Sequence, residues 1–371
     1  MKKELGYILL CSALILGACR STHKFSDKKL PSLAAKYKND FLIGTALDLP
    51  QINGADPATM EISKTQFDAT TPENIMKCEE IHPAWNKYLW NHADLYVSEG
   101  QKNKQFIVGH TLIWHSQLSP FVRQIQSKDS LLLFMQNHIA TVAGRYTGKI
   151  GSWDVVNEAL NEDGSFRKSV FYNLLGADYI PTAFQLAAKA DPHAQLYYND
   201  YNIEQPEKRA GAIALIKLVK ANGGRIDGIG IQGHWHVNDI PFKAIEESIK
   251  EFSALGVKVA FTELDLSVLP NPKKLVGADV NQHFEGSNEM NPYTQGLPDS
   301  VGKMLADQYA QLFKLFLKYK KDISRVTFWG TNDKQSWLND FPVKGRTNYP
   351  LLFDRNNQPK KAFYSLINLK N

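Results

Sequence analysis

Two glutamates stand at the ends of short apolar runs in the sequence. Glu158 closes the run that starts at Ser152, and Glu263 lies near the end of the run that starts at Val259. Two facing carboxyl groups can break a glycosidic bond, because one protonates the leaving oxygen while the other attacks the anomeric carbon or activates water. A single glutamate at a strand end is more often a salt-bridge or capping partner. The residues around the pair therefore decide between sugar chemistry and a structural role.

Polar side chains that can hydrogen-bond a sugar hydroxyl end most of the other apolar runs. They are His110, Trp114, His115, Asn157, Asn199, Asp200, Tyr201, Gln232, His234, His236, Asp265 and Trp329, with Glu73, Asn74 and Lys77 after a weaker run. These neighbours favour glycoside hydrolysis over a structural role for the two glutamates. Aromatic rings, which sugar clefts use, are also plentiful: 7 Trp, 15 Tyr and 19 Phe.

The histidines suggest a metal site as an alternative. His234 and His236 share one face of a strand, and His110 and His115 could lie near them. Barrel hydrolases that bind zinc carry a His-x-His pair on their first strand, whereas the first run here, FLIGTAL from Phe41, has no histidine. We therefore predict no catalytic metal and no organic cofactor. A histidine that hydrogen-bonds a carboxylate or a sugar hydroxyl explains the pattern better.

Strands and helices alternate along the chain. The expected strands are FLIGTAL (from Phe41), a weaker run around 66–70, FIVGHTLIW (from Phe106), SWDVVNE (from Ser152), LYYNDY (from Leu196), IGIQGHW (from Ile229), VAFTELD (from Val259) and VTFWG (from Val326). They are apolar on both faces, as parallel strands covered by helices must be. Amphipathic segments between them predict helices over 129–146, 206–222, 242–255 and 301–319.

Eight such strands predict an α/β fold, a (β/α)8 TIM barrel that forms a single catalytic domain over residues 36–371. An open, doubly wound sheet is the alternative, but no glycine-rich phosphate loop follows the first strand. In a barrel of this kind the chemistry lies at the C-terminal ends of the strands, where the polar residues stand.

Charge and composition exclude several classes of protein. The 371 residues are 43% hydrophobic and 22% charged, which is typical of a globular chain. A net charge of +5, from 43 Lys and Arg against 38 Asp and Glu, is too mild for a nucleic-acid binder. We expect no nucleic-acid partner and a monomeric protein.

The N-terminus has the features of a bacterial export signal. Lys2 and Lys3 precede an apolar stretch over 5–16, and Leu-Gly-Ala-Cys ending at Cys19 resembles a lipobox. We predict a lipoprotein signal peptide over 1–18, a lipid on Cys19 that anchors the chain to a membrane, and a tether over 19–35. A plain signal peptide is the alternative. The protein would then be exported and face the periplasm or the outer cell surface.

About 35 residues rich in Pro, Asn, Gly and Asp separate Asp265 from the helix near Val301. Loops beyond about 15 residues are uncommon and usually functional or disordered. Because this segment leaves the strand of Glu263, it must emerge beside the catalytic face. We hypothesise that it walls the leaving-group side of the cleft, and a passive surface loop is the alternative. The side chains expected to contact sugar are Asn281, Gln282, His283, Asn288, Asn291 and Tyr293.

The chain resembles glycoside hydrolase family 10, the endo-β-1,4-xylanases, in eight blocks that occur in family order. The blocks are TPENIMK (71–77), GHTLIWHSQ (109–117), WDVVNEAL (153–160), YYNDYN (197–202), GIGIQGHW (228–235), FTELDL (261–266), WGTNDKQSW (329–337) and PLLFD (350–354). The resemblance implies endo-acting, retaining hydrolysis of xylan and xylo-oligosaccharides, with Glu158 as the general acid/base and Glu263 as the nucleophile.

The resemblance also implies supporting roles for other side chains. Asn157 would bind the 2-hydroxyl of the reacting sugar, and His234 and Asp265 would hold Glu263 as a carboxylate. Tyr201 would stack on the leaving-group side. The sugar-binding residues on the other side would be Glu73, Asn74, Lys77, His110, Trp114, Gln117, Gln232, Trp329 and Trp337.

The retaining mechanism requires different protonation states of Glu158 and Glu263. Glu158 must be protonated at rest while Glu263 is charged, and a separation of about 5–5.5 Å lets each shift the pKa of the other. We expect hydrogen bonds from His234 and Gln232 to favour the charged form of Glu263. Two other functions remain open on the residues alone: a different barrel glycosidase, such as a β-glucanase, and a glycan-capture lipoprotein without catalytic activity.

Overall fold

The computed structural model describes residues 30–370. The predicted signal peptide (1–18), Cys19 and the tether up to residue 29 lie outside the described residues. Among the helices of residues 30–370, none is long and apolar enough to cross a membrane.

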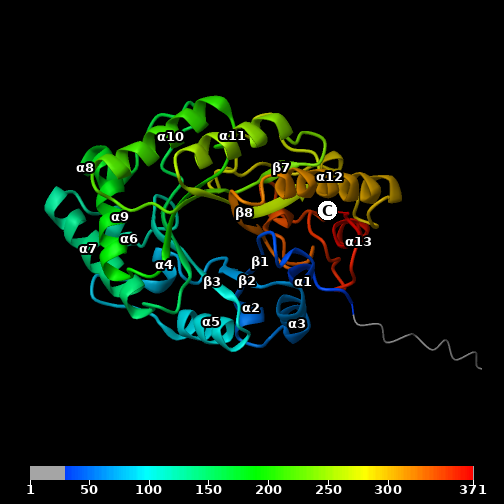
Figure 1. The fold of residues 1–371 in the computed structure, drawn as a ribbon, viewed down its shortest axis with the longest axis horizontal. Coiled ribbons are helices and arrows are strands. Elements are labelled where there is room, and N and C mark those ends of the chain that lie inside the picture. The colour runs from blue at the N-terminus through cyan, green and yellow to red at the C-terminus, as the bar shows by residue number, and fades with distance from the viewer. Residues whose placement is uncertain (1–29, 371) are drawn as a thin grey trace, which may run out of the picture. The chain divides into compact units, whose positions relative to one another are not determined.

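Eight parallel strands close into a barrel, which confirms the predicted fold. They are β1 (Leu42–Leu47), β2 (Ala69–Pro72), β3 (Phe106–Trp114), β4 (Ser152–Asn157), β5 (Gln195–Asp200), β6 (Gly228–Ile231), β8 (Lys258–Ser267) and β9 (Ile323–Phe328). Each strand pairs with the next one, and β9 returns to pair with β1, so the sheet has no free edge. Figure 1 shows the helices arranged around these strands.

The run from Ile229 to Trp235 forms two strands rather than one. β6 ends at Ile231, and β7 (His234–His236) pairs with the far end of β8. Gly233 separates them with φ 84°, a left-handed conformation that glycine adopts without steric cost. This break turns the chain so that Gln232 and His234 reach the barrel mouth in different directions.

The helices bury most of the apolar residues that the sequence indicated, although Leu133 is 46% exposed. They are α1 (Leu33–Tyr37), α2 (Leu49–Ile52), α3 (Pro57–Gln66), α4 (Cys78–Ile81), α5 (Asn91–Lys102), α6 (Pro120–Arg123), α7 (Lys128–Arg145), α8 (Val170–Leu175), α9 (Tyr179–Ala190), α10 (Pro206–Ala221), α11 (Phe242–Ala254), α12 (Asp299–Lys318) and α13 (Lys361–Ile367). In α7, Leu131, Met135, Ile139 and Val142 recur every three to four residues and are buried, while the Ser127 hydroxyl caps the N-terminus.

The folded domain begins earlier than the predicted boundary at residue 36. Leu33 and Tyr37 on α1 are fully buried. The Leu33 amide donates to the Gln66 side chain (3.2 Å), and the Tyr37 hydroxyl donates to the Leu366 carbonyl (2.8 Å). The predicted tether over 19–35 is therefore too long at its C-terminal end. Two apolar side chains one helical turn apart already pack into the core of the domain there.

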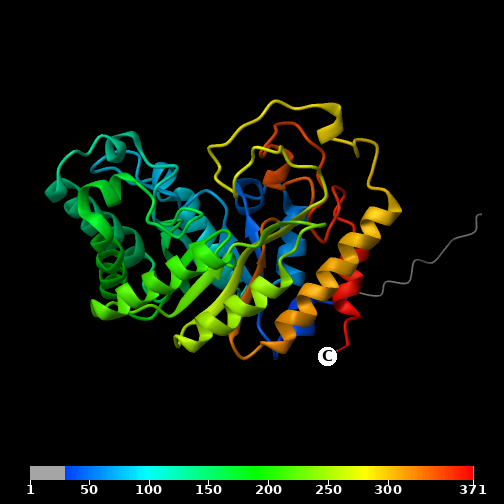
Figure 2. The ribbon, with the colours of Figure 1, turned by 90° about the horizontal axis from the view of Figure 1, so that it is seen from above.

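The long segment after β8 has little regular structure. Between Ser267 and Asp299 it forms one short 3₁₀ turn, Asn288–Met290. In Figure 2 this segment is the yellow to gold chain that arches at the top of the view. Its position at the C-terminal mouth agrees with the expectation that it emerges beside the catalytic face.

Candidate active site

A pocket of about 150 Å³ lies at the C-terminal mouth of the barrel. Its lining residues are Glu73, Asn74, Lys77, His110, Trp114, Gln117, Asn157, Glu158, Gln232, His234, Glu263, Ala278, Val280, Trp329 and Trp337. The structure thus brings together both glutamates and almost every sugar-binding residue that the sequence indicated. Ala278 and Val280 are additional, and they come from the long segment after β8.

Glu158 follows the last residue of β4 and is 5% exposed. Its backbone is left-handed (φ 54°), which turns the side chain into the mouth as the strand ends. The Trp114 indole donates to Oε2 (2.8 Å), and the Gln232 amide donates to Oε1 (3.0 Å). Burial raises the pKa of Glu158, the two hydrogen bonds lower it, and the Glu263 charge raises it. The net pKa is above the ordinary value, which suits a proton donor.

Glu263 lies inside β8 and is equally buried, but its surroundings favour the opposite charge state. The Asn199 amide donates to Oε1 (2.7 Å), and Nε2 of His234 lies 3.2 Å from Oε2. Burial alone raises the pKa of Glu263. The His234 hydrogen bond, the charges of His110 and His234, and the Asn199 hydrogen bond lower the pKa below its ordinary value. A charged carboxylate in a dry pocket suits a nucleophile.

Asp265 holds His234 in the protonated form. Nδ1 of His234 lies 3.0 Å from Oδ1 of the fully buried Asp265, and the Trp337 indole donates to Oδ2 (2.8 Å). Burial lowers the pKa of His234, but the charge of Asp265 and the bonds to Asp265 and Glu263 raise it to about 10. Both ring nitrogens therefore carry protons near neutral pH, so Nε2 is a donor to Glu263.

The expected role of Gln232 is wrong. Its amide donates to Glu158 and not to Glu263. The Glu263 backbone amide instead donates to the Gln232 carbonyl (2.9 Å), which places the two residues side by side and sends the Gln232 side chain toward β4. A strand-end position in the sequence does not say which neighbour a side chain will face.

Asn199 takes the donor role beside Glu263, a role that the sequence did not assign to this strand-end residue. Its Oδ1 accepts from the Thr262 hydroxyl (2.5 Å), which orients the amide. The Nδ2 group then donates both to Glu263 and to Oδ1 of Asn157 (2.9 Å). This contact orients the Asn157 amide, and its NH₂ group can donate to a sugar hydroxyl. The sequence signals for Asn199 are its place near the end of a strand and within the YYNDYN block, and neither indicates that it faces Glu263.

The other side of the pocket is organised around a buried lysine. Nζ of Lys77 donates to Asn74 and to Gln117, each at 2.8 Å, and Gln117 donates to Glu79 (3.1 Å). Burial lowers the pKa of Lys77. Burial, followed by the charge of Asp48, raises the pKa of Glu73 to about 7. The polar groups are thus aligned without a ligand, as a site for hydroxyl groups requires.

Two aromatic residues and a histidine complete this side. Nδ1 of His110 lies 2.9 Å from Oδ2 of Asp154, which directs the other ring nitrogen away from that carboxylate. The His110 ring meets the Trp329 ring edge to face, with centroids 5.5 Å apart. Trp337 stacks on Phe341 at 4.5 Å and is also held by Asp265. These contacts orient both indoles, which form walls of the pocket.

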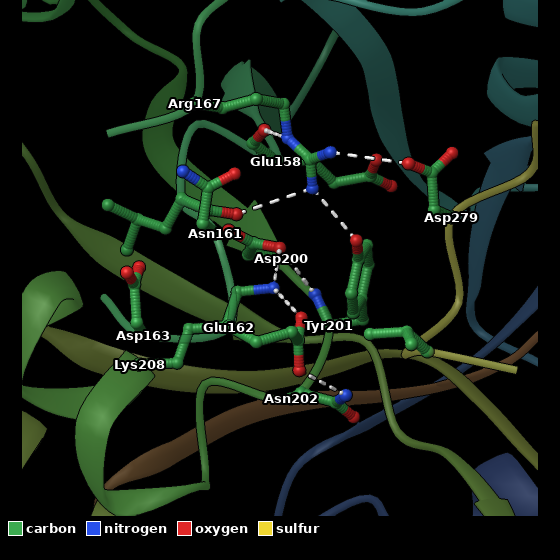
Figure 3. Close-up of polar contacts among 12 residues, drawn as sticks. Glu158, Asn161, Glu162, Asp163, Arg167, Asp200, Tyr201, Asn202, Lys208 and Asp279 are labelled. Carbon is green, nitrogen blue, oxygen red and sulfur yellow. Dashed lines mark hydrogen bonds and ion pairs between the residues drawn. The ribbon is translucent and has the colours of Figure 1, made fainter. Parts of the chain in front are cut away.

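Tyr201 lies elsewhere than expected. It is 3% exposed and does not line the pocket, although the resemblance implied that it stacks on a sugar. The Arg167 guanidinium donates to its hydroxyl (2.8 Å), and the Lys208 ammonium lies 3.6 Å from its ring centroid. Figure 3 shows these side chains around the Tyr201 ring. Neither Arg167 nor Lys208 had been singled out in the sequence, because neither ends a strand.

The six polar side chains expected to bind sugar from the long segment do not line the pocket. Several make contacts that fold the segment instead. Asn281 donates to Asp279 (2.8 Å), Gln282 bonds the Val276 backbone, and Asn291 accepts from the Thr347 amide (2.9 Å). A segment without regular structure must satisfy its backbone groups with side chains, which uses the polar groups.

Metal-binding clusters are not found in the part of the chain that the structure describes: no three His, Cys, Asp or Glu side chains there gather in a group that could hold an ion. His234 is engaged by two carboxylates, and Nδ1 of His236 lies 3.2 Å from the Asn238 amide. These contacts account for the His-x-His pair that suggested a metal.

Comparison with known proteins agrees with this site. The model of glycosyl hydrolase family 10 matches residues 32–369. Endo-1,4-beta-xylanase A of Xylanibacter ruminicola is 43% identical over 89% of this chain and 90% of its own length. A beta-1,4-xylanase of Dictyoglomus thermophilum is 40% identical over 91% of each chain. The solved structure of a GH10 endoxylanase from a sugarcane soil metagenome is 44% identical, with a TM-score of 0.86 over 92% of this chain and 99% of its own. This chain therefore belongs to glycosyl hydrolase family 10.

Proposed function

We propose that this chain, an endo-1,4-β-xylanase, cleaves xylan with Glu158 as general acid/base and Glu263 as nucleophile. The observation that carries the assignment is the pair itself. Two buried carboxyl groups line one pocket. Burial and the charge of Glu263 favour the neutral form of Glu158, whereas hydrogen bonds from His234 and Asn199 favour the charged form of Glu263. In the first step Glu263 attacks the anomeric carbon while Glu158 gives its proton to the leaving oxygen.

The second step uses the same two groups. When Glu263 becomes a glycosyl ester its negative charge disappears, and the repulsion that raises the pKa of Glu158 disappears with it. Glu158, now a carboxylate, removes a proton from water, which attacks the ester and releases the sugar with its original configuration. Within this mechanism Asn157 binds the reacting sugar, while His234 and Asp265 keep Glu263 charged.

Sugar selection is proposed to depend on the indoles that wall the pocket. Xylose lacks the C6 hydroxymethyl group of glucose, and the pocket walls that Trp329 and Trp337 form would exclude such a group. Exclusion of one such group is worth about 1–3 kcal/mol. We therefore expect weak activity on β-1,4-glucans beside strong activity on xylan. A β-glucanase would show the reverse order, and a glycan-capture protein would cleave neither.

The stereochemistry of the first product tests this mechanism. Proton NMR during hydrolysis of xylohexaose should show the β-anomer at the new reducing end first, with the α-anomer appearing only as the sugar equilibrates. Products of several lengths should appear together, because an endo-acting enzyme cuts internal bonds. Initial release of the α-anomer would contradict a nucleophilic role for Glu263, since a single displacement inverts the centre.

We also propose that the protein is exported and anchored to a membrane through a lipid on Cys19, which lies outside the described residues. The support is the sequence pattern alone. Acyl chains acting together anchor a protein firmly, whereas one chain is marginal. Cys19→Ser is expected to move the enzyme from the membrane fraction to the soluble fraction with its activity per molecule unchanged. Cys78→Ser is the matched control and should stay with the membranes. Sedimentation of the Cys19 variant with membranes would contradict the anchor.

A further inference from the structure

The long segment after β8 reaches across the barrel mouth. Around the barrel, β6 and β5 lie between β8 and β4. Asp279 nevertheless lies 3.3 Å from Arg167, which follows β4. The segment must therefore pass over the ends of β6 and β5 to make this ion pair. Figure 3 shows Asp279 meeting Arg167 beside Tyr201.

The part of the segment that makes the crossing is a tight turn, residues 276–282, which we call the tip. The Val276 amide donates to Oε1 of Gln282 (3.0 Å), and the Gln282 amide nitrogen donates back to the Val276 carbonyl (2.5 Å). On either side the chain is tied to the loop that follows β9: Arg346 donates to the Pro270 carbonyl (2.9 Å), and the Phe284 amide donates to the Pro342 carbonyl (3.0 Å). The tip is thus a preformed unit between two anchors.

The tip covers the residue expected to receive the leaving group. Gly277 packs so closely on Tyr201 that a Cβ there would lie 2.6 Å from Cε2 of the ring. Tyr201 is consequently 3% exposed. On the other side of the tip, Ala278 and Val280 line the pocket that holds Glu158 and Glu263. A sugar released by Glu158 therefore meets the tip before it can reach the Tyr201 ring.

Arg167 is a fixed anchor for the tip. Its guanidinium donates to the Glu158 carbonyl (3.2 Å), the Leu160 carbonyl (3.3 Å) and the Tyr201 hydroxyl (2.8 Å). These three acceptors belong to the barrel wall and hold Arg167 whether or not Asp279 is present. The Asp279 and Arg167 side chains are 28% and 16% exposed, so water screens their attraction only in part. Asp279 is the partner that can leave.

We propose that the Asp279–Arg167 ion pair is a latch that determines substrate length, because it holds the tip over Tyr201 and must open before a leaving group of several sugars can bind. The proposal rests on the proposed roles of Glu158 and Glu263. When the ion pair is formed, the pocket accepts a small leaving group together with the sugars that become attached to Glu263. When the ion pair is broken, the tip moves away from Tyr201, and the leaving-group side of the pocket opens to solvent. The apparent Kd of a long substrate is its intrinsic Kd divided by the fraction of molecules that are unlatched.

Asp279→Asn tests the latch, because it removes the charge and retains the size and the local bond to Asn281. We expect kcat/KM on xylohexaose to rise about two- to fivefold, the upper part of the range expected when one such ion pair is lost. On 4-nitrophenyl xylobioside, whose leaving group carries no further sugar, the change should stay below about twofold. Glu285→Gln, an exposed acid on the same segment, is the matched control and should leave both rates unchanged.

A second variant opens the tip by a different route. Gly277→Ala places a methyl group against the Tyr201 ring, and φ of 60° also strains alanine at this position. It should shift the two rates in the same direction as Asp279→Asn. Added salt should raise the wild-type rate on xylohexaose toward that of Asp279→Asn and leave the variant unchanged.

Cleavage by trypsin tests the latch independently of catalysis. Lys273 and Lys274 lie just before the tip and are exposed, so trypsin should cut there faster in both variants than in the wild type. The latch would be overturned if Asp279→Asn left the ratio of the xylohexaose rate to the xylobioside rate unchanged, or if it lowered the rate on xylohexaose. If the wild type itself fails to cleave xylohexaose, the proposed function fails instead, so the two failures are distinguishable.

Discussion

Glu263→Ala is expected to lower xylan hydrolysis by at least about 10⁴-fold, the order seen when a catalytic nucleophile is removed. The reason is that Glu263 is proposed to form the covalent bond, and the neighbouring His234 and Asn199 side chains cannot replace it. Binding of xylo-oligosaccharides should persist, because the pocket lining contributes many other polar groups. Calorimetric titration with xylotriose checks the binding, and reducing-sugar release checks the rate.

Azide identifies the lost group as a nucleophile. In Glu263→Ala a small anion can occupy the space of the missing carboxylate and attack the anomeric carbon directly. With an aryl xylobioside, turnover should return and the product should be a glycosyl azide of inverted configuration. Glu61→Ala, an exposed glutamate on α3, is the control and should behave as the wild type. Substantial xylan hydrolysis by Glu263→Ala without azide would remove Glu263 from the nucleophile role.

Glu158→Ala is expected to separate two classes of substrate. Xylan needs a proton on its leaving oxygen, so its hydrolysis should fall by about 10²–10⁴-fold. A dinitrophenyl leaving group needs little protonation, so the first step on an aryl xylobioside should be spared. The second step still lacks its base, so the glycosyl enzyme should accumulate and appear as a burst of released phenol. Azide should then speed turnover and give a product of retained configuration.

The pH profile gives an independent check on Glu158. The wild-type rate should fall as the pH drops through the lowered pKa of Glu263 and as it rises through the raised pKa of Glu158, because the active form has the first charged and the second protonated. In Glu158→Ala the fall at high pH should vanish for the aryl substrate. Equal losses on xylan and on the aryl substrate, with the high-pH fall preserved, would contradict the acid/base assignment.

Local patterns in the sequence were enough to predict the barrel and the catalytic pair. Alternating apolar runs and amphipathic segments allow few folds, since buried parallel strands need helical cover on the outside. Closure then brings the C-terminal end of every strand to one mouth. Glu158 and Glu263 are 105 residues apart in the sequence, yet their positions at strand ends already implied that they meet.

Only the tertiary structure decided which side chain faces which. Gln232 and Asn199 both end strands, but the bend at Gly233 sends Gln232 to Glu158, while the Thr262 hydroxyl turns the Asn199 amide to Glu263. The contacts of the segment after β8 were equally hidden, because they join it to Arg167 and Arg346 in other loops. A strand end is set by local periodicity, whereas a hydrogen-bond partner or a loop path depends on contacts between residues far apart in the chain.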